Sequence, residues 1–307
     1  MADGPPLVSV VVSSHDRPGL LGEALATIAA QTLRDREILV VDNRSPRSAE
    51  IARIVAGCPE ARLIASPVNA GFPGAVNLGL REARGRYIFI TEDDILLPPE
   101  CLATLAAHLD ANPGDGIVTG RLVERTNGQL LYAGGEVALD PVFRMRITGR
   151  GEPDRAWDPA PVHVSYAPCG MVMVRRSLLD RIGPMRGDFF MYYEDTEFCL
   201  RALAAGAGVV CLRGLRLLHH ASPPTGNVVL VDYHKLKNMR AMYFLLAPAR
   251  VLPEFVARYG VAEPLRELVK DPARWWRMVR AWAWVLVHLP GLLGERRRIA
   301  RLGAQRT

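Results

Sequence analysis

The sequence predicts an α/β protein in which a doubly wound, mostly parallel sheet is followed by a helical C-terminal extension. Short β-branched segments alternate with helical patterns through the first half of the 307 residues. From about residue 231 onwards, the pattern is helical and rich in aromatic residues and Arg. Alternating strands and helices form parallel sheets covered by helices. We expect one domain over residues 1–230, in halves 1–119 and 120–230, and the extension over residues 231–307.

The predicted elements follow one another closely along the chain. The segment LVSVVVS, residues 7–13, is apolar enough to be a strand buried on both faces. A helix is predicted over 19–31, where Leu21, Leu25 and Ile28 recur at helical spacing. Further strands are predicted over 37–41, 62–65, 87–91, 170–174, 208–212 and 215–218. Further helices are predicted over 48–56, from the turn NAGFPG to residue 83, over 177–182 and in the second half of FFMYYEDTEFCLRALAAG. Residues 120–165 have the pattern of short strands and turns.

Composition and charge exclude several classes of protein. With 49% hydrophobic and 23% charged residues, the chain is neither disordered nor fibrous. Residues 272–307 contain eight Arg and one Glu, a surplus of +7 that exceeds the net charge of +6 for the whole chain. The rest of the chain is therefore close to neutral, and we expect no nucleic-acid partner.

The cysteines and the apolar segments indicate the compartment. The five cysteines are scattered and form no CxxC pair, which argues against a disulfide framework and against a zinc site. The N-terminus MADGPPLVSV lacks the basic residues and the long apolar run of a signal peptide. The longest apolar stretch, 281–293, contains His288 and Pro290 and is shorter than the roughly 20 residues that span a bilayer. We therefore expect a cytoplasmic protein.

Polar side chains follow three of the predicted strands. His15 and Asp16 follow the first strand, Asp42 and Asn43 follow the second, and the triplet 92–94, EDD, follows a later one. In an open parallel sheet, ligands bind beyond the carboxyl ends of the strands. Acidic groups cannot hold a diphosphate alone, but a divalent Mg²⁺ or Mn²⁺ between them would bind both. Each acid alone could be a helix cap or a turn residue, but that reading does not account for the whole set.

Six segments together resemble the family 2 glycosyltransferases, particularly the rhamnosyltransferase-like members. They are VSVVVSSHDRPGLLGEAL, VVDNRS, NAGFPGAVNLGL, TEDD, FFMYYEDTEFCLR and LLHHAS, and they occur in the order of that family across about residues 7–245. The resemblance implies a GT-A fold, with residues 1–119 as the nucleotide-binding half and 120–230 as the acceptor half. It also implies a nucleotide diphosphate sugar as donor, a divalent Mn²⁺ or Mg²⁺ ion, a hydroxyl acceptor and inversion at the anomeric carbon.

The resemblance also assigns roles to individual residues. Asp42 would bind the nucleotide base, and Asp94 and His219 would bind the metal, with His220 as the alternative to His219. The triplet EDD stands where the family has its DxD motif, but this chain places Glu first. The other residues expected to contact the donor are Ser13, His15, Arg17, Asn43, Asn69, Asn77, Glu92, Asp93 and Gly170. For Gly170, close approach of a sugar and simple tight packing are both open.

The pair Glu194–Asp195 has its own physical argument. An inverting transfer needs a base that removes the proton of the acceptor hydroxyl as it attacks the anomeric carbon. A carboxylate at a helix N-terminus is suited to this, and we expect it to be ionised at neutral pH. By resemblance, Asp195 is this catalytic base and Glu194 binds acceptor or sugar hydroxyls. The alternative is that both acids, with Glu197, only cap a surface helix.

The C-terminal segment RWWRMVRAWAWVLVHLPGLLGERRRIARL mixes Trp with Arg, which suits a helix at a membrane interface. Anionic lipid would attract Arg296, Arg297 and Arg298 by about 1 kcal/mol each. This predicts peripheral contact with the inner face of the plasma membrane. The alternative is a helical pair whose Trp face packs on the rest of the enzyme or in a homodimer.

The sequence therefore predicts a metal-dependent inverting glycosyltransferase that uses a UDP- or dTDP-sugar, in cell-envelope polysaccharide or glycolipid assembly. An acceptor that is a soluble natural product or a protein is the alternative. A processive synthase is disfavoured because QxxRW is absent, and a nicotinamide enzyme because no GxGxxG follows the first strand. A third class is a non-catalytic module that binds a nucleotide sugar or a lipid. The presence of both EDD and Asp195 argues against it.

Overall fold

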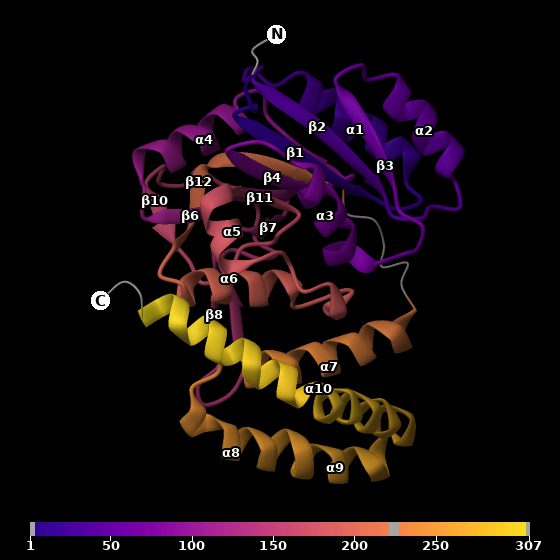
Figure 1. Ribbon diagram of the computed structural model, residues 1–307, viewed down its shortest axis with the longest axis vertical. Coiled ribbons are helices and arrows are strands. Elements are labelled where there is room, and N and C mark those ends of the chain that lie inside the picture. Colours follow the sequence, from indigo (N-terminus) through magenta and orange to yellow (C-terminus); the bar gives the residue numbers. More distant parts are fainter. Residues whose placement is uncertain (1–3, 221–226, 305–307) are drawn as a thin grey trace.

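The computed structural model describes residues 4–220 and 227–304. It contains one large mixed sheet with helices on it, a small hairpin and a helical extension (Figure 1). The strand order in the large sheet is β10-β12-β6-β11-β4-β1-β2-β3, with β5 paired to β12 and β7 paired to β6. The last two residues of the motif LLHHAS, Ala221 and Ser222, lie outside the described residues.

Four parallel strands form the N-terminal side of the sheet: β1 (Val8–Ser14), β2 (Arg36–Asp42), β3 (Ala61–Ala65) and β4 (Tyr87–Glu92). All seven residues of β1 are buried, as expected for a strand with a neighbour on each edge and helices on the faces. The register pairs Ser14 with Asp42 and Ser13 with Glu92. The carboxyl ends of these strands therefore meet at one edge of the sheet.

A reversed strand joins this part to the other half of the sheet. Strand β11 (Met171–Arg175) runs antiparallel to both β4 and β6 (Asp115–Glu124). Strand β12 (Gly208–His219) then lies parallel to β6. The mostly parallel α/β architecture predicted from the sequence is confirmed. The reversal of β11 brings residues 165–170 to the carboxyl end of β4, and the short strands β5, β7 and β10 also pair antiparallel with their neighbours.

The helices alternate with the strands, and α4 (Cys101–Ala111) is the one among them that was not predicted from the sequence. Helix α1 begins at Pro18, where the absent amide hydrogen costs nothing, and buries Leu21, Leu25 and Ile28 on its inner face. The helices up to residue 204 are α1 (Pro18–Ala29), α2 (Ser48–Ala56), α3 (Gly71–Glu82), α4 (Cys101–Ala111), α5 (Arg176–Ile182) and α6 (Glu194–Ala204). The small strands are β5 (Ile95–Leu96), β7 (Leu130–Tyr132), β8 (Gly135–Ala138), β9 (Arg144–Ile147) and β10 (Pro161–His163).

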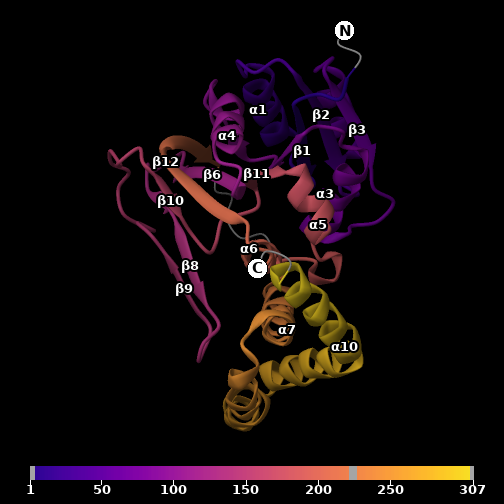
Figure 2. The same ribbon diagram turned by 60° about the vertical axis from the view of Figure 1, so that its left-hand side comes forward.

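The C-terminal extension is helical, as predicted. It comprises α7 (Val228–Leu246), α8 (Leu252–Phe255), the π-helix η3 (Val256–Ala262), α9 (Glu263–Lys270) and α10 (Pro272–Ala304), with a short turn of helix at Ala249–Val251. Figure 2 shows α7 and α10 packed together below the sheet, with the hairpin of β8 and β9 beside them. Within the described ranges, no helix is both long enough and apolar enough to cross a bilayer.

Two of the Trp side chains of α10 pack inside the protein, within the extension itself. Trp282 of α10 packs against Phe244 and Phe255, and its indole N–H donates to the Tyr259 carbonyl at 2.8 Å. Trp284 stacks on His288, with the Lys237 ammonium 4.7 Å from the Trp284 ring centroid. These two Trp side chains are therefore committed to contacts within the extension.

Candidate active site

An acidic cluster forms where β4 ends, and Arg17 lies against it. The Arg17 guanidinium is 2.5 Å from Asp93 Oδ1, 2.5 Å from Asp94 Oδ2 and 3.9 Å from Glu92 Oε2. Arg17 precedes α1 and Glu92 ends β4, so the cluster joins two strand ends that are 75 residues or more apart. One fixed positive charge thus balances part of the negative charge of three acids.

The ionisation of the cluster is uneven. Burial raises the pKa of Asp93 to about 6, and burial together with the charge of Asp94 raises the pKa of Glu92 to about 7. Burial acts in the same direction on Asp94, but contacts with His219 and Arg17 outweigh it and lower the pKa of Asp94. Asp94 is therefore the acid of the cluster that most readily carries a negative charge.

Asp94 and His219 lie side by side, as the resemblance implied. His219 Nε2 is 3.4 Å from Asp94 Oδ2, while Asp94 Oδ1 and His219 Nδ1 are buried without hydrogen-bond partners. A carboxylate oxygen and an imidazole nitrogen are suitable ligands for Mn²⁺. Within residues 4–220 and 227–304, no group of three His, Cys, Asp or Glu is arranged around a common metal position. Asp94 and His219 are thus a pair of candidate ligands, not a complete metal site.

His220 contributes its backbone to this region. Its amide N–H donates to the Asp94 carbonyl at 2.8 Å, which holds the end of β12 beside the chain after β4. The sequence could not separate His219 from His220, and the structure places the His219 ring against the carboxylate of Asp94.

The residues expected to contact the nucleotide form a hydrogen-bonded set after β1 and β2. Asp42 Oδ1 accepts the Ser45 amide at 2.9 Å, and the His15 ring lies 3.1 Å from the Asn43 carbonyl. Asn43 Nδ2 donates to Asn69 Oδ1 at 3.1 Å. The His15 amide in turn donates to Asp93 Oδ2 at 3.3 Å, which links this set to the acidic cluster.

Asn77, which the resemblance places beside the nucleotide and the sugar, binds the backbone of Met185. Its Nδ2 donates to the Met185 carbonyl at 2.8 Å and its Oδ1 accepts the Met185 amide at 3.1 Å. The carboxamide therefore ties α3 to the chain after α5. This pairing uses the groups with which Asn77 would contact a sugar or a nucleotide.

Gly170 makes room for Glu92. A Cβ atom added at Gly170 would lie 2.5 Å from Glu92 Oε1, closer than such atoms can approach. The Gly170 carbonyl also accepts the Glu92 amide at 3.2 Å. The structure therefore shows tight packing of Gly170 against the Glu92 carboxyl group, and contact with a sugar stays a prediction.

The pair Glu194–Asp195 begins α6, and its two members have opposite environments. Asp195 Oδ2 accepts the Tyr166 hydroxyl at 2.9 Å, and Oδ1 accepts the Thr196 amide at 2.6 Å. Glu194 is 8% exposed, and its Oε2 has no hydrogen-bond partner. Because hydrogen bonds to a carboxylate favour the charged form, Asp195 is stabilised as the anion and Glu194 is not.

The pKa values of the pair agree with this division. Burial, and then the charge of Asp195, raise the pKa of Glu194 well above its usual range. Burial also raises the pKa of Asp195, against the opposing effect of the hydrogen bonds from Tyr166 and Thr196. Glu194 therefore holds a proton more firmly than Asp195. The charge of Glu92 adds to the upward shift of the Glu194 pKa.

Tyr166 is a site residue that the sequence did not reveal. It lies in the loop before β11, where no motif marks it, and its position depends on the reversal of that strand. Burial and the neighbouring Asp195 raise the pKa of Tyr166 well above its usual range, so its hydroxyl remains a donor. The segment from Tyr166 to Gly170 contacts Asp195 at one end and Glu92 at the other.

A strained loop precedes the pair, and a residue of the extension holds it. Phe190, Tyr192 and Tyr193 have φ angles of 64°, 63° and 67°, a region that non-glycine residues rarely occupy. Asn238 of α7 is fully buried, and its Nδ2 donates to the carbonyls of Phe189, Met191 and Tyr192 at 2.7–2.9 Å. Nothing in the pattern of α7 indicated this role.

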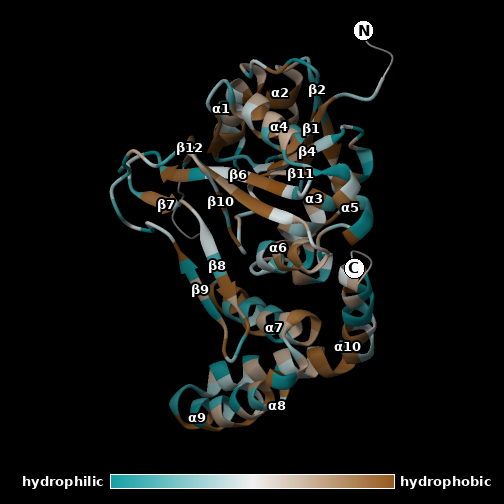
Figure 3. Ribbon diagram, turned by 90° about the vertical axis from the view of Figure 1, so that its left-hand side faces the viewer, coloured by the Kyte–Doolittle hydropathy of each residue, from teal (hydrophilic) through white to brown (hydrophobic). Residues whose placement is uncertain are grey.

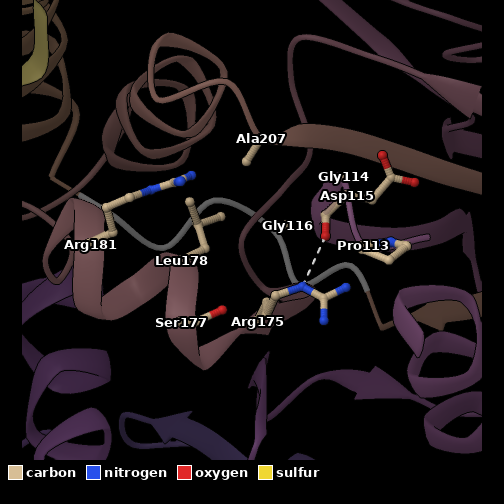
Figure 4. Close-up of a pocket in the computed structure, with 9 residues that line it drawn as sticks. All are labelled: Pro113, Gly114, Asp115, Gly116, Arg175, Ser177, Leu178, Arg181 and Ala207. Carbon is tan, nitrogen blue, oxygen red and sulfur yellow. Dashed lines mark hydrogen bonds between the residues drawn. The ribbon is translucent and has the colours of Figure 1, made fainter. Parts of the chain in front are cut away.

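A separate small cavity lies away from these acids. It has a volume of about 150 Å³ and lies between the ends of β11 and α5 and the start of β6 (Figure 4). Arg175, which lines it, pairs in register with Tyr87, the first residue of β4, and donates to the Asp115 carbonyl at 3.2 Å. The cavity is therefore at the edge of the sheet opposite Glu92.

The family model for glycosyl transferase family 2 matches residues 9–183. The chain belongs to glycosyl transferase family 2. The matched segment contains β1 from its second residue, the acidic cluster and Gly170, and it ends before Glu194, Asp195 and His219. The family assigned by resemblance is thus confirmed, whereas the rhamnosyltransferase-like character stays a prediction.

Relatives of this family 2 member include proteins of polysaccharide assembly. The O-antigen biosynthesis protein RfbC of Myxococcus xanthus is 29% identical over 236 residues, which are 71% of this chain and 18% of RfbC. An uncharacterized glycosyltransferase of Bacillus subtilis, YwdF, is 27% identical over 64% of this chain and 67% of its own length. The uncharacterized protein y4gI of Sinorhizobium fredii is 23% identical over 73% of this chain. The chain spans about a quarter of y4gI and about a fifth of RfbC.

Solved glycosyltransferase structures share the fold. GalNAc-T7, crystallised with UDP, GalNAc and Mn²⁺, superposes with a TM-score of 0.62 at 14% identity over 79% of this chain and 48% of its own. The mannosyltransferase PcManGT of Pyrobaculum calidifontis, in complex with GDP-Man and Mn²⁺, has a TM-score of 0.54 at 19% identity, over 99% of this chain and 87% of its own. The GT-A fold is confirmed.

Proposed function

We propose that this glycosyltransferase moves a sugar from a UDP- or dTDP-sugar to a hydroxyl acceptor with inversion at the anomeric carbon. The observation that carries the proposal is the arrangement of two acidic groups on either side of the segment from Tyr166 to Gly170. One is the cluster beside Arg17, suited to a cation and a diphosphate, and the other is the buried pair at the start of α6. A direct displacement needs one group at each end of the reacting bond.

Asp94 and His219 would hold a divalent cation, and the bound cation would neutralise the charge of the departing diphosphate. Two structural relatives are complexes that contain Mn²⁺ together with UDP or GDP-Man, which supports both the metal and the class of donor. Arg17 lets Asp93 and Asp94 stay close together by balancing their charges. Asp42, Asn43 and the residues bonded to them would bind the nucleotide.

Asp195 would be the catalytic base. Its carboxylate is stabilised by the Tyr166 hydroxyl and the Thr196 amide, and it is less buried than Glu194. It would accept the proton of the acceptor hydroxyl while the hydroxyl oxygen bonds to the anomeric carbon and the diphosphate leaves. Glu194, which retains its proton, would donate a hydrogen bond to a sugar or acceptor oxygen. A non-catalytic module has no need of such a buried pair of acids.

For the acceptor, we propose a saccharide of the cell envelope. The names of two relatives support this, namely the O-antigen biosynthesis protein RfbC and the succinoglycan biosynthesis protein ExoO of Rhizobium meliloti. A soluble natural product or a protein is the alternative acceptor. The test is to supply a donor with a labelled sugar. Incorporation of the label into an envelope extract, but not into protein or small-molecule fractions, would separate these acceptors.

The donor can be identified by thermal denaturation. We expect one UDP- or dTDP-sugar to raise the melting temperature when Mn²⁺ is present and to have little effect in EDTA. A ligand at 100 times its dissociation constant stabilises by about 2.7 kcal/mol. The same donor should be turned over slowly with water as acceptor, with release of the nucleoside diphosphate. If no nucleotide sugar stabilises the protein with either Mn²⁺ or Mg²⁺, the proposed reaction is wrong.

Replacing Tyr166 with Phe should shift the acid limb of the pH–activity profile to higher pH. The Tyr166 hydroxyl donates to Asp195 and favours its charged form, so its loss raises the pKa of Asp195 further. A base is inactive below its pKa, and the inactive range should therefore extend upward by about one pH unit. The measurement is donor turnover against pH.

The matched control is Tyr132→Phe. The Tyr132 hydroxyl is also buried, but it donates to the Tyr166 carbonyl at 2.6 Å and not to an acid. We expect this variant to lose stability without a shift of the acid limb. An acid limb that moves equally in both variants would show that the Tyr166 hydroxyl has no direct effect on Asp195.

A further inference from the structure

Helix α9 has its polar face inside and its apolar face outside. Leu265 and Val269 are 63% and 85% exposed, whereas Glu267 is buried. A helix on the surface of a globular protein normally buries its apolar stripe and exposes its charged stripe. The reversed orientation of α9 therefore requires an explanation both inside and outside the protein.

The inner side is explained by two cations of the neighbouring helices, of which Arg240 is fully buried and Arg274 is partly buried. Arg240 of α7 has no exposed surface, and its guanidinium lies 3.3 Å from Glu263 of α9. Arg274 of α10 lies 3.6 Å from Glu263 and 3.4 Å from Glu267. A buried guanidinium without a carboxylate is strongly unfavourable. The two acids, one helical turn apart, therefore have to face inward, and Leu265, Leu268 and Val269 face outward as a result.

The outward residues form a continuous stretch of chain, which we call the α9 face. It comprises the exposed apolar residues Val256, Val261, Leu265, Leu268 and Val269 and the exposed basic residues Arg258, Arg266 and Lys270. In the described part of the chain, eleven of the thirteen large apolar residues that are exposed lie between residues 228 and 287. Figure 3 shows brown segments on α8 and α9 at the end of the molecule farthest from the sheet.

The charge on this face indicates what covers it. Residues 227–304 contain 14 Lys and Arg and six Asp and Glu, a net charge of +8, against +6 for the whole chain. The acids of α9 are turned inward, so the α9 face presents apolar and basic groups together. A second copy of the same face would bring Arg266 and Lys270 against like charges, which is unfavourable. An anionic lipid surface accepts both kinds of group.

We propose that the α9 face binds the surface of an anionic lipid bilayer. This inference goes beyond the reaction proposed above and does not depend on it. It also changes the part of the chain involved: the sequence pointed to the Trp and Arg residues of α10, but Trp282 and Trp284 are engaged within the extension. The apolar side chains of the face would enter the headgroup region, with the basic side chains beside lipid phosphates.

Vesicle flotation of the full chain tests this proposal. We expect binding to vesicles of phosphatidylcholine with 30% phosphatidylglycerol and little binding to phosphatidylcholine alone. The variant Leu265→Gln with Val269→Gln should weaken binding at least tenfold, and Arg266→Gln with Lys270→Gln should weaken it about tenfold. Both pairs are exposed, so melting temperatures should stay close to that of the parent protein.

The matched control is Leu286→Gln with Val287→Gln on α10, whose side chains are 62% and 76% exposed. These exposures are close to those of Leu265 and Val269, so loss of binding in the α9 pair alone would support the proposal. The proposal would be overturned if the α10 double variant lost vesicle binding while the Leu265→Gln, Val269→Gln variant kept it. It would also be overturned if the parent protein did not bind anionic vesicles. Light scattering that shows a dimer in the parent and a monomer in the α9 pair would assign the face to a second copy instead.

Discussion

Replacing Asp195 with Asn should reduce donor turnover by about 10²–10⁴-fold, the usual contribution of a general base. The carboxamide has nearly the shape of the carboxylate and can still accept the Tyr166 hydroxyl, but it cannot accept the proton of an attacking hydroxyl. In the proposed reaction Asp195 acts on the acceptor hydroxyl and does not hold the donor, so donor binding should be preserved. Calorimetric titration with the donor and Mn²⁺, beside a turnover assay, measures both quantities.

Asp180→Asn is the matched control for this variant. Asp180 is an exposed acid of α5, and its replacement changes the net charge by the same amount. We expect normal turnover in the Asp180 variant. If Asp195→Asn keeps more than a tenth of the parental rate, the base is another group, and Glu194 is then the first residue to replace.

Removing the carboxamide of Asn238 should have the next largest effect. Asn238→Ala leaves the carbonyls of Phe189, Met191 and Tyr192 without their donor, so the strained loop before Glu194 is free to relax. A shift of about 1 Å in a catalytic group can cost about 100-fold in rate. We expect kcat to fall by about tenfold to 100-fold, with little change in KM for the donor, and stability to fall by about 1–3 kcal/mol.

The variant Asn238→Asp separates hydrogen bonding from packing. It keeps the size of the side chain but loses the donating amide, so it should lose kcat as Asn238→Ala does. Assays well below the melting temperature of each variant exclude unfolding as the cause. An unchanged kcat in a destabilised Asn238→Ala protein would show that the residue is structural and does not position the acids of α6.

Much of the fold follows from local patterns. The strand ends at Asp42 and Glu92 were predictable because apolar β-branched runs stop at polar residues, and parallel pairing then brings these ends together. The reversed direction of β11 was not predictable, because a short apolar run has no sign that distinguishes parallel from antiparallel pairing. The position of Tyr166 depends on that reversal, and it was missed for the same reason.

The site was predictable to the extent that motifs mark it. The adjacency of Asp94 and His219 agrees with the roles implied by resemblance, although these roles remain proposals. Arg17 was expected to line the nucleotide pocket, and its ion pairs with Asp93 and Asp94 were not expected. Asn77 and Asn238 both contact backbone carbonyls of distant segments, and such contacts have no signature in the local sequence.

The contact between Asn238 and the loop before α6 has a consequence for engineering. Residues 1–230 contain every acid that the proposed reaction needs, yet the loop that aims two of them is anchored by α7. Consider a chimera that exchanges only the N-terminal 230 residues between relatives. It would separate the proposed catalytic pair, Glu194 and Asp195, from the Asn238 side chain that holds the preceding loop. To transfer donor specificity, it is therefore better to exchange a segment that ends before this loop. The recipient protein then keeps its own residues from about 187 onwards, with the loop and α7 together.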